Sequence, residues 1–266
     1  MPELPEVETI KRDLEKTVLG KKIVNVCMHN PRVIRQPAPR LFKKLIEGST
    51  IRNILRRAKL LIFELSNGYA LTIHLKMTGQ LVYPGGSSSS RVAFNFKGGQ
   101  TLDFNDQRLF GELRLIPDWK KLKFVCALGP EPFDLTFSDF KDMLSKKKTK
   151  IKPLLMDQSF ISGIGNLYAA EILFRAHIDP QRQAQSLNGS EAGVLFREMS
   201  RVLSRAISHG GSSVDDYVRV SGKKGDYSRF HRVYGRKDKP CFVCGEPIKR
   251  ITQGGRGTYF CAKCQN

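Results

Sequence analysis

The sequence contains no apolar run that could cross a membrane, because a spanning helix needs about 18 or more consecutive apolar residues. Its N-terminus has neither a positively charged leader nor an apolar core, and it therefore predicts no signal peptide. A basic amphipathic helix that could anchor the chain to a membrane surface is also missing. These absences make a membrane the weaker candidate partner, so none is expected, and they favour the cytoplasm as the compartment.

Acidic residues are scarce. The 266 residues contain 25 Asp and Glu against 45 Lys and Arg, which gives a formal charge of +20. An excess of one sign repels itself in the compact state and indicates a polyanionic partner, for which nucleic acid is the leading candidate. The length and the hydrophobic content of 40% fit a globular protein with more than one core.

Cysteine is sparse as well, but its placement is informative. Four of the six cysteines form two C-x2-C pairs, Cys241 with Cys244 and Cys261 with Cys264, separated by 16 residues. This spacing predicts one tetrahedral zinc ion with four thiolate ligands, a closed and therefore structural site. The alternative is two disulfides, which are uncommon in a reducing cytosol.

The segment between the two cysteine pairs carries three glycines around Arg256, which predicts a two-stranded ribbon with a glycine-rich tip. A rigid ribbon with an arginine at its tip is suited to contact a negatively charged partner. The two remaining cysteines, Cys27 and Cys126, are expected to be buried.

Apolar residues recur at helical spacing over residues 3–18. The period then shifts towards two, with Asn67-Gly68 and Gly98-Gly99 as hairpin signals, and indicates an antiparallel sandwich or barrel. The expected strands are 23–28, 51–54, 60–65, 70–75, 80–83, 92–96, 101–104 and 112–116. Beyond the lysine run 146–150, the pattern predicts helices at 136–146, 151–157, 167–176 and 190–208.

Three further segments of the second half are notable. The lysine run is typical of a solvated face. Residues 162–166, Ser-Gly-Ile-Gly-Asn, form either a flexible corner between helices or a turn that aims backbone N–H groups at a phosphate. Residues 221–225 are expected to form a mobile loop.

Five stretches match one known family together. They are Pro2-Glu3-Leu4-Pro5-Glu6-Val7-Glu8, His74-Leu75-Lys76-Met77-Thr78-Gly79, Asp106-Gln107-Arg108-Leu109-Phe110-Gly111, Asp157-Gln158 with Gly163-Ile164-Gly165-Asn166-Leu167-Tyr168, and residues 255–265. In this order they resemble the bacterial formamidopyrimidine-DNA glycosylases (Fpg), a base-excision repair family.

The resemblance implies an α+β fold and a division of the chain. Residues 1–130 are expected to form a catalytic antiparallel β-sandwich with a leading helix. Residues 131–235 are expected to form a helical DNA-binding domain with a helix-two-turn-helix, and residues 236–266 the four-cysteine zinc ribbon. Damaged duplex DNA is expected to lie in a basic cleft, bound by a monomer in the bacterial cytoplasm and associated with the nucleoid.

The family also implies roles for the first stretch. Pro2, freed by removal of Met1, is expected to attack C1′ of the damaged nucleotide, because an amine nucleophile gives an iminium that acts as an electron sink. Glu3 is expected to shuttle protons, with Glu6 orienting the N-terminus and Lys59 assisting elimination and binding phosphate. The structural alternatives are acidic residues at a helix N-terminus and an exposed strand lysine.

Further residues would replace the everted base and bind DNA. Met77, Arg108 and Phe110 are expected to fill the space left in the duplex, although the two apolar side chains could instead belong to the core. Asn166 and Arg256 are expected to bind phosphates beside the lesion. Lys150 is expected to bind DNA too, and His74 is either a phosphate contact or an ordinary strand histidine.

The activity implied by the resemblance is excision of oxidised purines followed by β,δ-elimination. One alternative is the related endonuclease VIII type, which removes oxidised pyrimidines by the same chemistry. Another is a zinc-ribbon protein that binds DNA without catalysis. The Pro2-Glu3 pair argues against the second alternative, and Leu4-Pro5 favours the purine branch.

Overall fold

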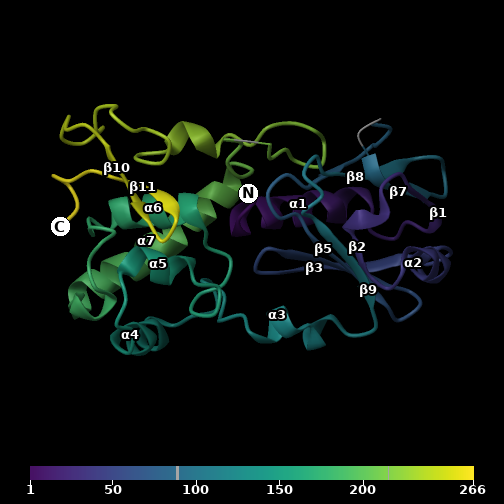
Figure 1. The fold of residues 1–266 in the computed structure, drawn as a ribbon, viewed down its shortest axis with the longest axis horizontal. Helices are drawn as coiled ribbons and strands as arrows, with labels where there is room; N and C mark the ends of the chain where they lie inside the picture. The colour runs from purple at the N-terminus through teal and green to yellow at the C-terminus, as the bar shows by residue number, and fades with distance from the viewer. Residues whose placement is uncertain (88–89, 215) are drawn as a thin grey trace. The chain divides into compact units, whose positions relative to one another are not determined.

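The structure is a computed structural model that describes residues 1–87, 90–214 and 216–266. The chain divides into two compact units (Figure 1). The N-terminal unit comprises Met1–Cys126 and the returning segment Ile207–Ser228. The C-terminal unit comprises Ala127–Ala206 and Arg229–Asn266.

The N-terminal unit begins with helix α1 (Leu4–Thr17) and contains two sheets. One is antiparallel throughout, in the order β1 (Ile23–Met28), β7 (Ser90–Phe96), β8 (Thr101–Asn105) and β6 (Gln80–Val82). The other has the order β2 (Ile34–Gln36), β9 (Glu112–Ile116), β5 (Ala70–His74), β4 (Leu60–Leu65) and β3 (Ile51–Arg57). Only β2 departs from the predicted antiparallel pattern among the described residues, since it pairs with β9 in parallel.

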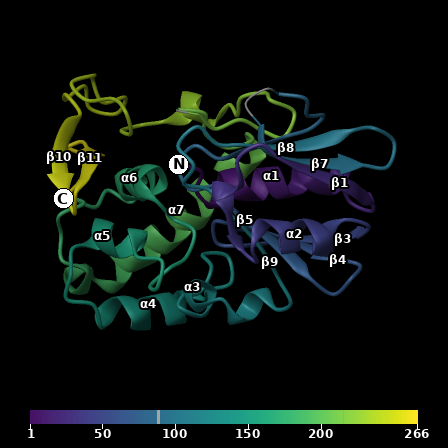
Figure 2. The same ribbon diagram turned by 45° about the vertical axis from the view of Figure 1, so that its right-hand side comes forward.

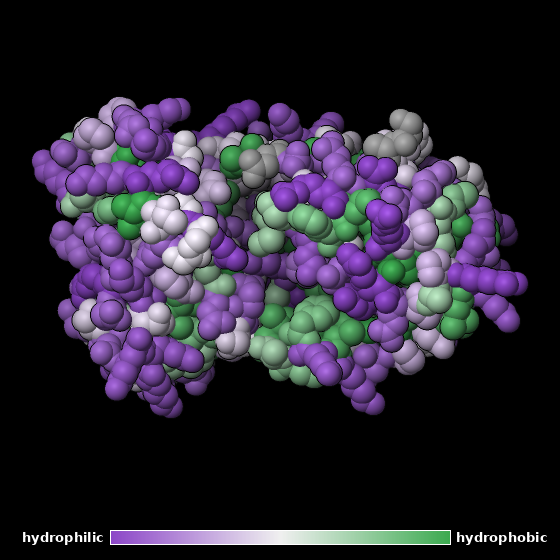
Figure 3. Space-filling view, viewed as in Figure 1, coloured by the Kyte–Doolittle hydropathy of each residue, from purple (hydrophilic) through white to green (hydrophobic). Residues whose placement is uncertain are grey.

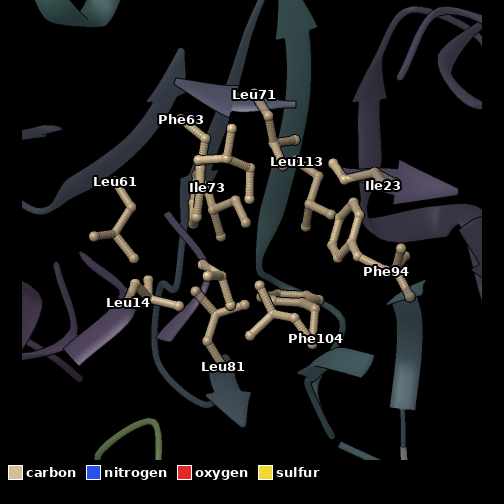
Figure 4. Packing of buried hydrophobic residues seen from close by; sticks show 14 of the residues in the cluster. Leu14, Ile23, Leu61, Phe63, Leu71, Ile73, Leu81, Phe94, Phe104 and Leu113 are labelled. Atoms are coloured by element: carbon tan, nitrogen blue, oxygen red, sulfur yellow. The ribbon is translucent and has the colours of Figure 1, made fainter. Parts of the chain in front are cut away.

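Alternating side chains of both sheets build one hydrophobic core (Figure 4). Phe63 and Ile73 come from the five-stranded sheet, and Phe94 and Phe104 from the four-stranded sheet. Helix α1 contributes its apolar stripe, including Leu14, to the same cluster. The strands with a two-residue period and the helix with a helical period therefore pack into one core. The predicted β-sandwich with a leading helix is confirmed.

Several short elements were not predicted. They are the 3-10 turns η1 (Pro31–Val33) and η2 (Trp119–Lys121) and the helices α2 (Pro39–Ile46) and α3 (Lys123–Cys126). Helix α2 buries only Phe42 and Ile46, so its eight residues hold too little periodic pattern for prediction. The burial predicted for the remaining cysteines was wrong, because Cys126 is exposed and Cys27 only partly buried.

The returning segment completes the N-terminal unit. Tyr217 and Val220 join its core, and the backbone N–H of Tyr83 donates to the Val220 carbonyl at 2.7 Å. Arg219 forms a bidentate ion pair with Asp13 of α1, with N–O distances of 2.7 and 3.1 Å. The loop expected to be mobile, residues 221–225, therefore directly follows two anchored residues, and it exposes residues 221–224 at its tip.

The C-terminal unit is helical and ends in a β-ribbon (Figure 2). Its elements are α4 (Phe137–Ser145), α5 (Ile151–Met156), α6 (Asn166–Arg175), η3 (Ala184–Ser186), α7 (Gly189–Ser208), η4 (Tyr227–Phe230), β10 (Lys249–Gln253) and β11 (Arg256–Phe260), the last helix and η4 crossing the unit boundary. The ribbon packs on α6, where Ala170 and Phe174 meet Ile248 and two cysteines. The predicted helices and ribbon are confirmed.

The face shown in Figure 3 is mostly polar. Hydrophilic side chains cover most of it, with several groups of apolar side chains between them. Among the described residues, no helix combines the length and the apolar character needed to cross a bilayer.

Candidate active site and metal centre

The start of α1 is a buried cluster of catalytic side-chain types. Pro2, Glu3 and Glu6 are all buried, with Glu3 5% and Glu6 3% exposed. One carboxylate oxygen of Glu6 accepts from the backbone N–H of Glu3 at 2.8 Å, and the other accepts from that of Ser212 at 2.8 Å. Glu6 thus ties the first residues of the chain to the returning segment.

The space around Glu6 is closely fitted. Gly211 has φ +78°, and a Cβ atom there would lie 3.0 Å from the Glu6 carboxylate oxygen. A side chain at this position would be strained in its backbone and would also crowd Glu6. The sequence suggested only that Glu6 orients the N-terminus, and its contacts with residues more than 200 positions away were not predictable from spacing.

Lys59 lies in the two-residue turn between β3 and β4 and is only 7% exposed. Its burial excludes an ordinary exposed strand lysine. The turn is fixed by Arg56, whose guanidinium donates to the Ala58 carbonyl at 3.0 Å and to the Glu8 carboxylate of α1 at 2.8 Å. The turn that carries Lys59 is therefore tied to the helix that carries Glu3.

Glu8 of α1 holds Arg56 in place. Sequence analysis named Glu8 only as part of the first matching stretch and gave it no role of its own. It accepts from Arg56 and, at 2.8 Å, from Arg12 one helical turn away. Burial would raise the pKa of Glu8, but the hydrogen bonds from the two arginines outweigh it and hold this pKa below its usual value. Glu8 is thus a permanent anion that positions Arg56. Its i, i+4 spacing to Arg12 was the available signal.

Asp106 joins two loops that lie far apart in the sequence. This carboxylate is 2% exposed and accepts from the backbone N–H groups of Arg108 at 3.2 Å and Gly111 at 2.7 Å. It also accepts from the Thr78 hydroxyl of the other loop. A Cβ at Gly111 would lie 2.5 Å from the ring of Phe104, so this close approach requires glycine. One buried anion therefore positions both loops.

The three side chains predicted to replace a base lie together on these loops. Met77 is 44% and Phe110 46% exposed, which excludes core packing for both. The Arg108 guanidinium donates weakly to the Met77 sulfur at 3.5 Å and lies over the Phe110 ring, 4.7 Å from its centroid. The result is an exposed group of one cation, one thioether and one aromatic ring, on loops that the buried Asp106 carboxylate holds together.

His74 ends β5 and is neutral. Its Nδ1 accepts from the backbone N–H of Lys76 at 3.0 Å, so the proton of the neutral ring lies on Nε2. Burial lowers the pKa of His74 to about 4, and the charge of Lys76 contributes in the same direction. His74 can therefore act as a neutral N–H donor.

In the C-terminal unit, the predicted corner is rigid. The side chain of Gln158 accepts from the Gly163 N–H at 2.9 Å and donates to the Ile164 carbonyl at 2.8 Å. Residues 161–165 are buried, and Asn166 at the start of α6 is partly exposed. These hydrogen bonds and this burial argue against a flexible corner.

Asn166 connects the corner to the ribbon. Its Oδ1 accepts from the buried Lys152 ammonium at 2.6 Å, and its Nδ2 donates to the Gly257 carbonyl at 3.1 Å. The second N–H of that amide can serve a ligand. Arg256, next to Gly257, is exposed and lines a pocket of about 150 Å³ together with Lys152. The structure thus brings the Asn166 and Arg256 segments together. Lys150 is an exposed residue at the start of α5.

The four predicted zinc ligands converge. The sulfurs of Cys241, Cys244, Cys261 and Cys264 lie within 4.8 Å of one another. The Cys241–Cys264 and Cys244–Cys261 sulfur distances are 3.9 and 3.5 Å. Tetrahedral zinc with bonds of about 2.3 Å requires sulfurs roughly 3.8 Å apart, whereas a disulfide needs about 2 Å. The cluster fits one structural zinc ion, and the disulfide alternative is wrong.

Glu171 anchors the segment that leads into the zinc site, and spacing gave no signal for it. This fully buried carboxylate on α6 accepts from the backbone N–H groups of Arg232, Val233 and Tyr234 at 2.8–3.0 Å. Burial raises the pKa of Glu171, against the lowering effect of these three hydrogen bonds.

Comparison with known proteins covers all parts of the chain. Residues 1–113 match the formamidopyrimidine-DNA glycosylase N-terminal domain, 128–218 its H2TH domain and 238–266 a zinc finger found in FPG and IleRS. The formamidopyrimidine-DNA glycosylase of Pelotomaculum thermopropionicum is 42% identical over 273 residues, covering 100% of this chain and 99% of the relative. That of Moorella thermoacetica is 43% identical over 259 residues, covering 94% of each.

Solved structures of similar proteins superpose on this chain along nearly its whole length. The MutM (Fpg) protein from Thermus thermophilus superposes with a TM-score of 0.90 at 39% identity, covering 99% of this chain and 98% of that one. A Lactococcus lactis FPG variant, solved in complex with a Fapy-dG containing DNA, superposes with a TM-score of 0.92 at 35% identity, covering 99% of both chains.

Proposed function

Because the chain belongs to the formamidopyrimidine-DNA glycosylase family of DNA-repair enzymes, we propose that it excises oxidised purines from duplex DNA and then cleaves the abasic strand. The substrates would be 8-oxoguanine and formamidopyrimidines. The Lactococcus lactis relative bound to a Fapy-dG containing DNA supports this substrate class. The place of action would be the bacterial nucleoid, and the enzyme would work as a monomer.

One observation carries the proposal: the buried start of α1, where Glu6 holds the residues that follow Pro2. An N-terminal proline nitrogen needs a fixed direction to attack one carbon of a nucleotide, and a rigid first turn supplies it. The adjacent Glu3 and the buried Lys59 supply an acid–base group and a cation on neighbouring elements. An acidic residue that merely favours a helix N-terminus, or an exposed strand lysine, would not need to be buried.

The proposed chemistry begins with a free secondary amine. Removal of Met1 would convert the Pro2 amide into an amine with a pKa of roughly 8, so a useful fraction is unprotonated at neutral pH. Its lone pair would attack C1′ while the bond from C1′ to the base breaks and the base leaves with that electron pair. Glu3 would transfer the proton that opens the sugar ring, leaving an iminium between Pro2 and C1′.

The iminium would then act as an electron sink for strand cleavage. Loss of a C2′ proton would expel the 3′ phosphate, and a second elimination would expel the 5′ phosphate. Lys59 would assist these steps and bind a phosphate oxygen. Hydrolysis by water would release the sugar fragment and restore Pro2.

Base eversion would use the exposed group of Met77, Arg108 and Phe110. Removing a nucleotide from the stack costs a few kcal/mol, and side chains that occupy the vacated space offset part of that cost. The exposure and mutual contacts of these three residues support this role.

Phosphate binding would hold the strand on both sides of the lesion. His74 would donate from Nε2 as a neutral ring, and Lys150 would contribute charge. Asn166 and Arg256 would bind through the rigid corner and the ribbon tip, whose contact supports a shared role. Zinc would keep the ribbon folded, without taking part in the reaction. In these terms residues 1–130 serve chemistry together with the returning segment 207–228. The rest of residues 131–235 serves DNA binding, and residues 236–266 form the zinc ribbon.

Reductive trapping tests the nucleophile. Borohydride added during turnover of an 8-oxoguanine duplex should reduce the iminium and leave a 1:1 protein–DNA adduct on Pro2. Pro2→Gly keeps a primary amine and should retain slow trapping, whereas one extra N-terminal residue should abolish it. If the extended protein were still trapped and Lys59→Ala were not, Lys59 would be the nucleophile and the proposal would be wrong.

A panel of duplexes tests the substrate class. Duplexes containing 8-oxoguanine, thymine glycol or an abasic site should be cleaved, with the 8-oxoguanine duplex preferred over thymine glycol. Preference for thymine glycol would favour the endonuclease VIII type. Binding without cleavage of any of the three would favour a protein that binds DNA without catalysis.

A further inference from the structure

The first zinc-binding turn carries two exposed apolar side chains. Phe242 is 63% and Val243 66% exposed, the highest values among the large hydrophobic residues that the structure describes. The backbone N–H of Val243 donates to the sulfur of Cys241 at 3.4 Å, so the turn is fixed to the metal site. A rigid turn that holds an aromatic ring in solvent, at the expense of hydrophobic burial, indicates a ligand for the ring.

An arginine fixes the ring from one side. The Arg236 guanidinium lies over Phe242 with its carbon 3.5 Å from the ring centroid, and the carbon of Arg232 lies 5.3 Å away. Arg236 is itself held by the carbonyls of Arg232 and Pro240 at 2.7 and 2.8 Å. The guanidinium therefore covers one face of the ring in one orientation, while Phe242 as a whole stays 63% exposed.

The positive charge around Phe242 indicates a negatively charged partner. Residues 229–250 contain seven lysines and arginines against two acidic residues. An exposed ring beside arginines is the arrangement that binds single-stranded nucleic acid, because any unpaired base can stack on the ring while the cations meet the phosphates. We propose that Phe242 stacks an unpaired base of single-stranded DNA, a contact beyond the excision site.

This contact is separate from the residues assigned to duplex binding. Phe242 lies beside Cys241, where the ribbon is joined to the metal, whereas Arg256 lies at the glycine-rich tip. The ring is thus free to bind a single strand next to a duplex, such as an overhang or a gap. Its effect should depend on unpaired bases and not on the lesion.

The test compares Phe242→Ala with the matched variant Val243→Ala, both in the zinc-containing full chain. Fluorescence anisotropy measures affinity for an unmodified single strand of about 12 nucleotides and for a lesion duplex. Phe242→Ala should weaken single-strand binding by about 5- to 150-fold, the range for loss of one stacked base, and leave excision from the duplex unchanged. Phe242→Trp should restore binding, and Val243→Ala should change it little.

Zinc content, measured in every variant, shows that the ribbon is folded. Single-strand affinity equal to that of the original protein in Phe242→Ala would overturn the proposal and point to a protein partner for this turn. An equal loss in Val243→Ala would also overturn it, because the contact would then be apolar without stacking. Neither outcome affects the trapping experiment on Pro2.

Discussion

Replacing Asp106 by asparagine should loosen both loops that carry Met77, Arg108 and Phe110, the side chains proposed to replace an everted base. The carboxylate accepts from the Arg108 N–H, the Gly111 N–H and the Thr78 hydroxyl. An amide of the same shape has one acceptor and one donor end. Whichever way it is turned, its NH₂ faces the backbone N–H of Gly111 or of Arg108, and one buried donor loses its acceptor.

The size of the effect follows from these contacts. A hydrogen bond to a charged group contributes about 1.5–3 kcal/mol, and an unsatisfied buried donor costs about 1–3 kcal/mol. Since the two terms overlap, Asp106→Asn should lower the free energy of unfolding of the N-terminal unit by about 2–4 kcal/mol. Excision of a damaged base should fall more than cleavage at an abasic site, which has no base to evert.

The assay can isolate this unit. Trp119 is the only tryptophan of the chain and lies in the N-terminal unit, so its fluorescence in urea follows that unit without the other. Glu15→Gln is the matched control, since it makes the same change in the partly exposed pair with Lys11 and should cost less than about 0.5 kcal/mol. An Asp106→Asn protein as stable as that control, with unchanged excision, would refute the reasoning.

Four further results are expected. Cys244→Ser should release one equivalent of zinc and abolish DNA binding while tryptophan-monitored unfolding stays unchanged, whereas Cys126→Ser should keep its zinc. Phe110→Ala should slow base excision more than abasic-site cleavage in single-turnover assays, and equal losses would contradict a role in eversion. Arg256→Ala should make the slope of log affinity against log salt shallower by roughly one unit on every duplex, as expected for one lost phosphate contact. Because the folded pKa of His74 is about 4 and the unfolded value about 6.5, the folded state resists protonation. Tryptophan-monitored stability should therefore fall as the pH drops from about 6.5 towards 4, and His74→Gln should flatten that slope.

Local patterns predicted most of the fold. Strand 60–65 and strand 112–116 have the predicted bounds because each is a short segment between turn signals, the first a nearly continuous apolar run and the second an alternating one. The unpredicted strand β2 has three residues and pairs with β9, nearly 80 positions along the chain, so nothing local marks it. The return of Tyr217 to the first core is equally non-local.

The site shows the same division. The zinc ligands and the Pro2-Glu3 start were recognisable because their chemistry depends on neighbours in sequence. The anchoring roles of Glu6, Asp106 and Glu171 depend on backbone N–H groups of distant segments, and the type of residue alone carries no sign of them. Exposure excludes the core-packing alternative for Phe110, which periodicity could not do.

The N-terminal unit is completed only late in synthesis, because its last segment, residues 207–228, follows most of the other unit in the sequence. A ribosome that has released residues 1–126 has made every strand of the N-terminal unit that the structure describes, yet Glu6 and Asp13 still lack their partners Ser212 and Arg219. At translation rates of about 5–20 residues per second, roughly 5–20 seconds pass before the returning segment emerges. During that interval Glu6 and Asp13 lack the contacts that they make in the complete chain. A message broken before codon 207 yields a polypeptide that never gains these contacts, so we expect truncated products to be inactive.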